Sequence, residues 1–108
     1  MQQSAQLFKA LCEPVRIRML NLLNHNEEIC VCDLMTTLEI SQSLASRHLA
    51  YLRNSGLVSA RREGVWMHYR LNKSDWQVQW ICEYLDRLAK QDKQLQADLD
   101  VLQAANCC

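Results

Sequence analysis

The 108-residue sequence contains a single proline, Pro14, and two glycines, Gly56 and Gly64. It has no low-complexity segment, no internal repeat and no linker-like stretch. No run approaches the roughly 18 to 20 consecutive apolar residues that a membrane-spanning helix requires. The first residues also lack the basic start and apolar run of a secretory signal. We therefore expect one compact, mostly helical domain over residues 1–108, located in the cytoplasm and without a membrane partner.

The formal net charge is zero, which argues against a chain that binds polyanions over its whole surface. The charges are unevenly distributed, however. Residues 41–73 contain six Lys or Arg residues and one carboxylate, whereas the segments before and after them are net acidic. If a polyanion binds, we expect it to contact this middle third of the chain.

Apolar residues that recur every three or four positions predict four helices in the first half of the chain. These helices cover residues 4–12, 14–23, 30–38 and 42–54. Ser41 is a favourable N-cap for the fourth helix, and Gly56 is a favourable residue for its C-terminal end. The short connection between the third and fourth helices is typical of a helix-turn-helix.

Two strand-like segments follow, over residues 57–62 and 65–71, and Glu63-Gly64 between them suits a tight hairpin. A helix-turn-helix followed by a β-hairpin is the winged-helix arrangement. We therefore predict a mainly α fold with a small β-hairpin. The recognition helix would cover about residues 42–54 and the wing about residues 57–71.

The exposed start of a recognition helix meets base edges and phosphates in the major groove of DNA. Basic residues at the hairpin tip would reach the backbone or the minor groove. The candidate DNA-binding residues are Gln42, Ser43, Ser46, Arg47, His48, Arg61, Arg62 and Gly64. A solvated helix face and hairpin are the alternative, and His48 has two interpretations, a phosphate contact or a packed core histidine.

A final helix is predicted over about residues 75–103, with leucine-rich heptad spacing interrupted by Asp92, and the pattern leaves open whether the helix continues past that residue. Because so small a domain cannot bury this seam alone, we expect a homodimer formed through the N- and C-terminal helices. The candidate interface residues are Leu7, Leu11, Trp80, Ile81, Tyr84, Leu85 and Leu88. A two-fold dimer presents its recognition helices roughly 34 Å apart, so the expected partner is double-stranded operator DNA with an imperfect inverted repeat.

Six cysteines in a chain without signs of export indicate free thiols or metal ligands. Cys30 and Cys32 begin the predicted third helix, where the helix dipole favours thiolate, and thiolates select soft ions. Residues two apart in a regular helix point about 200° apart. We therefore expect ion binding to distort the first turn of this helix and to move the recognition helix. The alternative is that both cysteines are small core residues.

Several segments carry a resemblance to a known family. They are residues 7–11, 14, 16–20, 28–34, 41–43, 46–49, 52–53, 56–58, 61–64 and 69, including the sequence Cys-Val-Cys-Asp-Leu at 30–34. With them the chain resembles the ArsR/SmtB family of metalloregulatory repressors, and in particular its arsenic-responsive members. The resemblance implies a repressor of an arsenic-resistance operon that leaves its operator when As(III) or Sb(III) binds Cys30 and Cys32. It implies no organic cofactor.

Met35 stands where many arsenic sensors of this family have a third cysteine. A third ligand would then come from Cys107 or Cys108, from Cys12 or Cys82, or from a small thiol. Two alternatives keep the fold: a sensor of Cd(II) or Pb(II), and a repressor switched by thiol oxidation, with Cys107 or Cys108 as the disulfide partner. Because the sequence has neither an oxyanion loop nor a Cys-x-x-Cys on a βαβ pattern, we do not expect an enzyme.

Overall fold

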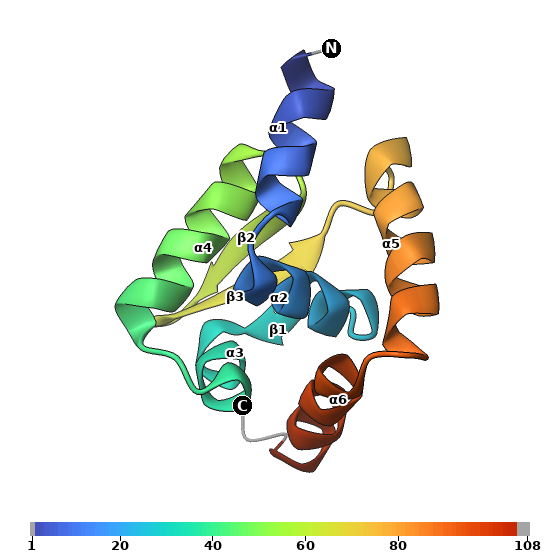
Figure 1. Ribbon diagram of the computed structural model, residues 1–108. Helices are drawn as coiled ribbons and strands as arrows, with labels where there is room; N and C mark the ends of the chain where they lie inside the picture. Colours follow the sequence, from blue (N-terminus) through green and yellow to red (C-terminus); the bar gives the residue numbers. More distant parts are fainter. Residues whose placement is uncertain (1, 106–108) are drawn as a thin grey trace.

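Six helices and a three-stranded antiparallel sheet form the computed structural model, which describes residues 2–105 (Figure 1). The helices are α1 (Gln2–Leu11), α2 (Pro14–Asn24), α3 (Val31–Leu38), α4 (Gln42–Asn54), α5 (Trp76–Ala89) and α6 (Lys93–Ala105). The strands are β1 (Ile29–Cys30), β2 (Val58–Glu63) and β3 (Trp66–Leu71). This order confirms the predicted winged helix-turn-helix. Within residues 2–105 no helix is long and apolar enough to cross a membrane.

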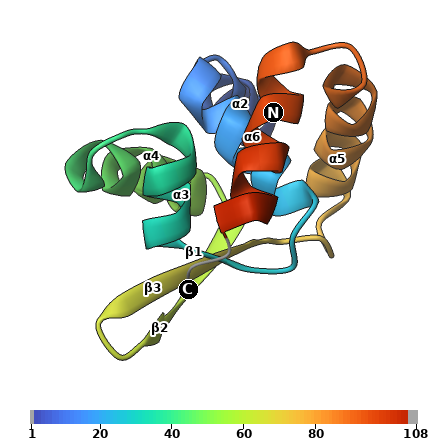
Figure 2. The same cartoon turned by 90° about the horizontal axis from the view of Figure 1, so that it is seen from below.

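The sheet contains one strand more than the sequence predicts. Its order is β1-β3-β2, and β1 consists of two residues that pair with Tyr69 and His68 of β3. The β2–β3 hairpin extends away from the helices as the wing (Figure 2). The segment just before α3 is therefore hydrogen-bonded to the wing, so these two parts of the chain are mechanically connected.

Helix α2 lies at the centre of the fold. Glu13 caps its N-terminus by accepting a hydrogen bond from the Val15 amide at 3.2 Å, and Pro14 occupies the first turn, where its missing N–H costs nothing. Met19, Leu20 and Leu22 are almost fully buried, and α1, α4, α5 and α6 all pack against this helix. Its nearly continuous apolar surface is thus explained by burial on all sides.

The region predicted as a final helix over about residues 75–103 is two helices, and the open question of continuity past Asp92 is settled: α5 ends at Ala89 and α6 begins at Lys93. The Asp92 carboxylate accepts a hydrogen bond from the Leu95 amide at 3.1 Å, so this interruption of the heptad pattern caps a new helix. Helix α6 then folds back against α2 and α3. There Arg18 donates two hydrogen bonds of 2.9 Å to the buried Asp98 carboxylate.

Candidate nucleic-acid interface and thiol site

Helix α4 presents a polar face at its N-terminal end. Ser41 caps the helix, with its Oγ accepting a hydrogen bond from the Leu44 amide at 3.2 Å. The opposite face packs into the core through apolar residues, including Leu49 and Leu52. Four of the five candidate DNA-binding residues on this helix are exposed: Gln42, Ser43, Ser46 and Arg47. The structure therefore brings together the side chains that a major groove would meet.

His48 does not belong to this exposed face. It is 8% exposed, and its Nε2 lies 3.3 Å from a carboxylate oxygen of Glu13, the N-cap residue of α2. Burial lowers the pKa of the His48 imidazole below its ordinary value, an effect that Glu13 partly opposes. The prediction that His48 binds DNA is therefore corrected. His48 is the packed histidine of the second interpretation, and it connects α4 to the N-cap residue of α2.

A second link to α4, which sequence reasoning missed, comes from Arg16. Its guanidinium lies 4.2 Å from the centre of the Tyr51 ring on α4, a cation–π contact. The same group donates hydrogen bonds to the carbonyl oxygens of Ala10 and Lys9 at the end of α1. The sequence shows only that this arginine follows Pro14 near the start of α2, and no local pattern indicates its contacts with α1 and α4. The recognition helix is thereby fixed to α1 and α2.

The wing carries the remaining DNA-binding candidates, and the structure places them differently. Arg62 and Gly64 are exposed, and Gly64 adopts a φ of 63° in the tight turn, where a residue without Cβ is favoured. Arg61 is engaged by carboxylates: its Nη2 lies 2.6 Å from Glu28 and 3.1 Å from Glu63. Hydrogen bonding to Arg61 lowers the pKa of the Glu28 carboxyl, which keeps this pair ionised.

The two cysteines of the Cys-x-Cys motif lie close together. Cys30 is the last residue of β1 and the N-cap residue of α3, with extended backbone angles of φ −69° and ψ 143°. Because it precedes the helix, its sulfur lies 3.0 Å from that of Cys32. The expectation that a regular helix holds these sulfurs apart is wrong. Two thiolates on one ion, with bonds of about 2.3 Å, stand roughly 3 to 4 Å apart, a separation similar to that of these two sulfurs.

Other sulfur-containing side chains do not complete this site within residues 2–105, where no group of three or more His, Cys, Asp or Glu residues is arranged to hold a metal ion. Met35 packs against the core, and the exposed Cys12 thiol donates to the Lys9 carbonyl at 3.0 Å. Burial raises the pKa of the Cys82 thiol on α5, which disfavours the thiolate that an ion requires. Two further candidates, Cys107 and Cys108, lie outside the described residues.

An apolar surface lies between α1 and α5. Trp80 and Tyr84 are exposed there, and so are two further aromatic residues, Phe8 (58%) and Trp76 (71%). The Trp80 ring stacks near Tyr84 and meets Phe8 edge-on, with centroid distances of 6.5 and 6.2 Å. We call Phe8, Trp76, Trp80 and Tyr84 the aromatic face.

The other predicted interface residues are less accessible than the aromatic face. Leu7, Ile81 and Leu85 are buried in the core of their own subunit, whereas Leu11 and Leu88 are half-buried. Leu11, Ile81 and Leu85 nevertheless line the floor of a hollow of about 290 Å³ beside Phe8 and Trp80. Heptad spacing alone therefore did not distinguish the residues that pack inside the subunit from those that remain exposed at its surface.

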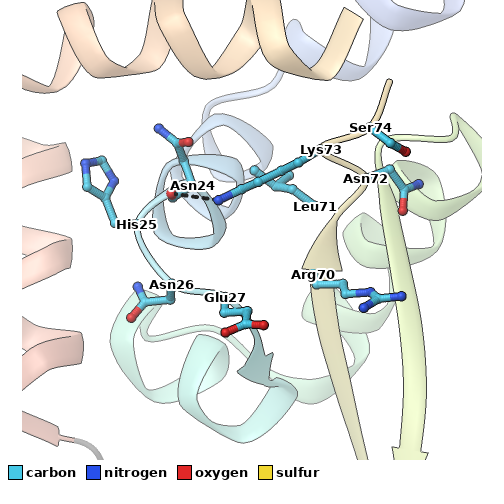
Figure 3. A pocket seen from close by; sticks show the side chains of 9 residues that line it. All are labelled: Asn24, His25, Asn26, Glu27, Arg70, Leu71, Asn72, Lys73 and Ser74. Atoms are coloured by element: carbon cyan, nitrogen blue, oxygen red, sulfur yellow. Dashed lines mark hydrogen bonds between the residues drawn. The ribbon is translucent and has the colours of Figure 1, made fainter. Parts of the chain in front are cut away.

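A second hollow, of about 550 Å³, lies between the end of α2 and the end of β3 (Figure 3). The Lys73 ammonium reaches across it to the Asn24 carbonyl oxygen at 3.5 Å. Arg70 and Glu27 add charges of opposite sign to the lining, which contains no cysteine. This hollow is therefore distinct from the thiol pair and from the exposed face of α4.

Comparison with known proteins identifies the family. Residues 13–60 match the model of the bacterial regulatory proteins of the arsR family. The arsenical resistance operon repressor of Escherichia coli (strain K12) is 42% identical over 94% of this chain and 86% of its own length. The chain belongs to the arsR family. The family resemblance seen in the sequence is thus confirmed.

Solved structures of arsR-type regulators have the same fold. HlyU from Vibrio cholerae N16961 matches with a TM-score of 0.74 and 38% identity, over 83% of this chain and 95% of that one. A homodimeric winged helix-turn-helix domain from Mycobacterium bovis, described as a possible ArsR-family regulator, matches with a TM-score of 0.70 and 31% identity, over 83% and 81%. The family and these neighbours are transcriptional regulators.

Proposed function

We propose that the protein is a homodimeric transcriptional repressor of an arsenic-resistance operon, which leaves its operator when As(III) or Sb(III) binds Cys30 and Cys32. The observation that carries this proposal is the 3.0 Å separation of the two sulfurs at the start of α3, the helix that packs against the recognition helix. The 42% identity to an arsenical resistance operon repressor supports the choice of ion and operon. In this role the protein acts in the cytoplasm by binding, without catalysis.

The thiol pair suits a trivalent metalloid. Thiolates are soft donors that favour soft ions, and each thiol loses its proton on binding. In the reduced protein, where Cys30 and Cys32 both carry thiols, two As–S bonds replace two As–O bonds of arsenous acid, and the two thiol protons leave with the displaced hydroxides as two molecules of water. One hydroxide then remains on arsenic, and a third thiol would replace it in the same way.

We assign this third position to Cys107 or Cys108. Helix α6 ends at Ala105, and its last turns lie beside the segment that leads into Cys30, because Leu102 and Gln103 line one hollow of about 230 Å³ together with Ile29. An extended chain spans roughly 3.3 to 3.6 Å per residue, so two or three residues beyond Ala105 reach about 7 to 11 Å. Met35 packs against the core, so the third ligand position on the ion could be taken by Cys107 or Cys108 instead.

Cys30 connects the ion to both DNA-reading elements. As the last residue of β1 it pairs with His68 on wing strand β3, and as the N-cap residue it begins α3, which contacts α4. A shift of Cys30 on ion binding would therefore disturb the relative placement of wing and recognition helix. Their joint fit to DNA is what positions Gln42, Arg47 and Arg62 against base edges and phosphates.

The aromatic face is the surface that we assign to the homodimer. Two large patches of aromatic residues in contact would bury apolar area that an isolated subunit exposes to water. A two-fold axis there would give each operator half-site one recognition helix, with centres roughly 34 Å apart. The expected operator is accordingly an imperfect inverted repeat.

Fluorescence anisotropy on a labelled fragment of the protein's own promoter tests the proposal. Arsenite added to the wild-type complex should release the DNA, whereas Cys30→Ser and Cys32→Ser should bind the same DNA and stay bound. Cys12→Ser, which removes an exposed thiol outside the pair, is the matched control and should behave as the wild type. Release of Cys30→Ser at the wild-type arsenite concentration would refute the assigned site.

The same cysteines also suit two other signals. Cd(II) or Pb(II) would use the two adjacent sulfurs, and thiol oxidation would close a disulfide with Cys107 or Cys108 as partner. Competition of arsenite, cadmium, lead and zinc for the wild-type protein, read as DNA release, ranks the ions. Peroxide without any ion tests the redox alternative. Release by cadmium, lead or peroxide at concentrations well below those of arsenite would replace the arsenic assignment.

A further inference from the structure

Glu28 and Arg61 form an ion pair that crosses the whole sheet. Glu28 directly precedes β1, whereas Arg61 lies on β2, and β3 runs between these two strands. The Arg61 Nε donates to the carboxylate at 2.8 and 2.9 Å, and its Nη2 lies 2.6 Å from the same group. The segment that leads into Cys30 and the outer strand of the wing, β2, are therefore joined by side chains as well as through β3.

Two further charged or titratable groups extend this pair into a network. Glu63 lies 3.1 Å from the Arg61 Nη2, and its carboxylate is also 3.5 Å from the Nε2 of His68. The Nδ1 of His68 in turn lies 3.8 Å from Glu28. An isolated surface ion pair contributes little, but several groups held in one geometry contribute more. We call these four residues, Glu28, Arg61, Glu63 and His68, the charge clamp.

The register of the sheet places the clamp beside the thiol pair. Cys30 pairs with His68 across β1 and β3, and His68 pairs with Arg61 across β3 and β2, so the three residues form one row. Directly paired residues share a face of the sheet, and Glu28, two residues before Cys30, is on the same face. A displacement of Cys30 along or away from β3 would therefore act on the short segment that carries the Glu28 carboxylate.

The backbone alone connects Cys30 to the wing weakly, because β1 contains only two paired residues. We propose that Glu28 is a positioning residue that transmits ion binding at Cys30 to the wing through its ion pair with Arg61. This inference rests on the proposed function of the thiol pair. Arg61 then influences DNA binding through the placement of the hairpin, and Arg62 is the wing arginine left for phosphate.

The test compares Glu28→Gln with Glu27→Gln, which removes the same charge one residue away at an exposed position outside the clamp. DNA affinity is measured with and without saturating arsenite, and the ratio of the two affinities is the coupling. Arsenite binding to the DNA-free protein is followed separately by ultraviolet absorption of the arsenic–thiolate bonds. This separate readout distinguishes a failure to bind the ion from a failure to transmit its effect.

Allosteric coupling is typically about 5- to 150-fold, and we expect Glu28→Gln to reduce the wild-type ratio about threefold to tenfold. Glu27→Gln should keep the wild-type ratio, and both variants should bind arsenite like the wild type. Arg61→Gln should reduce the ratio by a similar factor, and the double variant should lose no more than either single one.

Three outcomes would overturn the inference. Equal ratios in Glu28→Gln and Glu27→Gln would show that the clamp carries no signal. Weakened arsenite binding in Glu28→Gln would place Glu28 in the ion site itself. Additive losses in the double variant would show that Glu28 and Arg61 act separately. A failure of the proposed function is recognised independently, because the wild-type protein would then remain on DNA in saturating arsenite.

Discussion

The two helices of the helix-turn-helix begin differently, although their N-cap residues have almost the same extended backbone. Ser41 before α4 has φ −71° and ψ 160°, and its hydroxyl accepts a hydrogen bond from the first turn. Cys30 before α3 has φ −69° and ψ 143°, but its side chain makes no capping hydrogen bond. The Cys30 sulfur lies beside that of Cys32 instead.

This difference separates a helix start that is held by a capping hydrogen bond from one that lacks such a bond and that we propose to respond to ion binding. An N-cap hydroxyl typically stabilises a helix by about 0.5 to 2 kcal/mol, and α3 forgoes this contribution. Helix α4 has it and is further held by the contacts of Glu13 with His48 and of Arg16 with Tyr51. The proposed DNA-reading helix is therefore held by contacts from α2, while the start of α3 carries the two sulfurs that we propose as ligands. Four substitutions test this comparison.

The largest effect is expected from Cys30→Ser, which gives α3 the same N-cap residue as α4. Loss of one of two thiolates should raise the arsenite concentration needed for DNA release at least about 100-fold, near the upper end of the 5- to 150-fold range typical of allosteric coupling. The new hydroxyl should cap the helix, so the free energy of unfolding in urea should change by less than about 1 kcal/mol. A loss of several kcal/mol would instead indicate that the thiol is mainly a core residue.

Arg47→Ala tests the fixed helix start as the DNA reader. Removal of an exposed guanidinium that contacts a base or a phosphate should weaken operator binding by about 1 to 3 kcal/mol. Arsenite affinity in the absence of DNA should not change. Arg53→Ala removes the same charge from the exposed C-terminal end of α4 and should have a clearly smaller effect on operator affinity. Equal losses in the two variants would contradict the assigned face.

Ser41→Ala makes the start of α4 resemble the uncapped start of α3. The lost hydrogen bond to the Leu44 amide should lower the free energy of unfolding by about 1 kcal/mol, measured by urea denaturation. Ser46→Ala, at an exposed position within the same helix, should stay within about 0.5 kcal/mol of the wild type. If both variants were equally stable, the cap would not distinguish the two helix starts.

His48→Gln should give the smallest effect, visible as a change in pH dependence. Because burial lowers the pKa of His48 in the folded protein, the unfolded chain binds more protons below about pH 6.5, and stability falls as the pH decreases. Urea denaturation at pH 7.5 and 5.5 should show a smaller decrease for His48→Gln than for the wild type. His25→Gln, at an exposed histidine, is the control. An unchanged pH dependence in His48→Gln would show that His48 does not contribute.

Local signals in the sequence determined most of the elements. The recognition helix predicted over residues 42–54 agrees with α4, because Ser41 and Gly56 mark its two ends. The hairpin is likewise within one residue of β2 and β3, since Gly64 defines its turn. Caps and turns act over a few neighbouring residues, so they can be recognised without knowledge of the rest of the fold.

The division of the last helix was not predictable in the same way. A heptad pattern looks the same whether its apolar residues line one long helix or two packed ones. Asp92 was visible as an interruption, but only the docking of α6 against α2, with Asp98 meeting Arg18, makes a turn at that position favourable. The partners involved are about eighty residues apart in the chain.

The sequence by itself determined the fold class, the helix-turn-helix with its wing, and the pair of cysteines as the candidate sensor. Only the tertiary structure decided which side chains are accessible and what they contact. It buried His48, placed Arg61 between two carboxylates, exposed Phe8 and Trp76, and brought the Cys30 sulfur next to that of Cys32. The physical reason is that burial and charge pairing depend on neighbours from distant parts of the chain. Periodicity and caps, in contrast, are local properties.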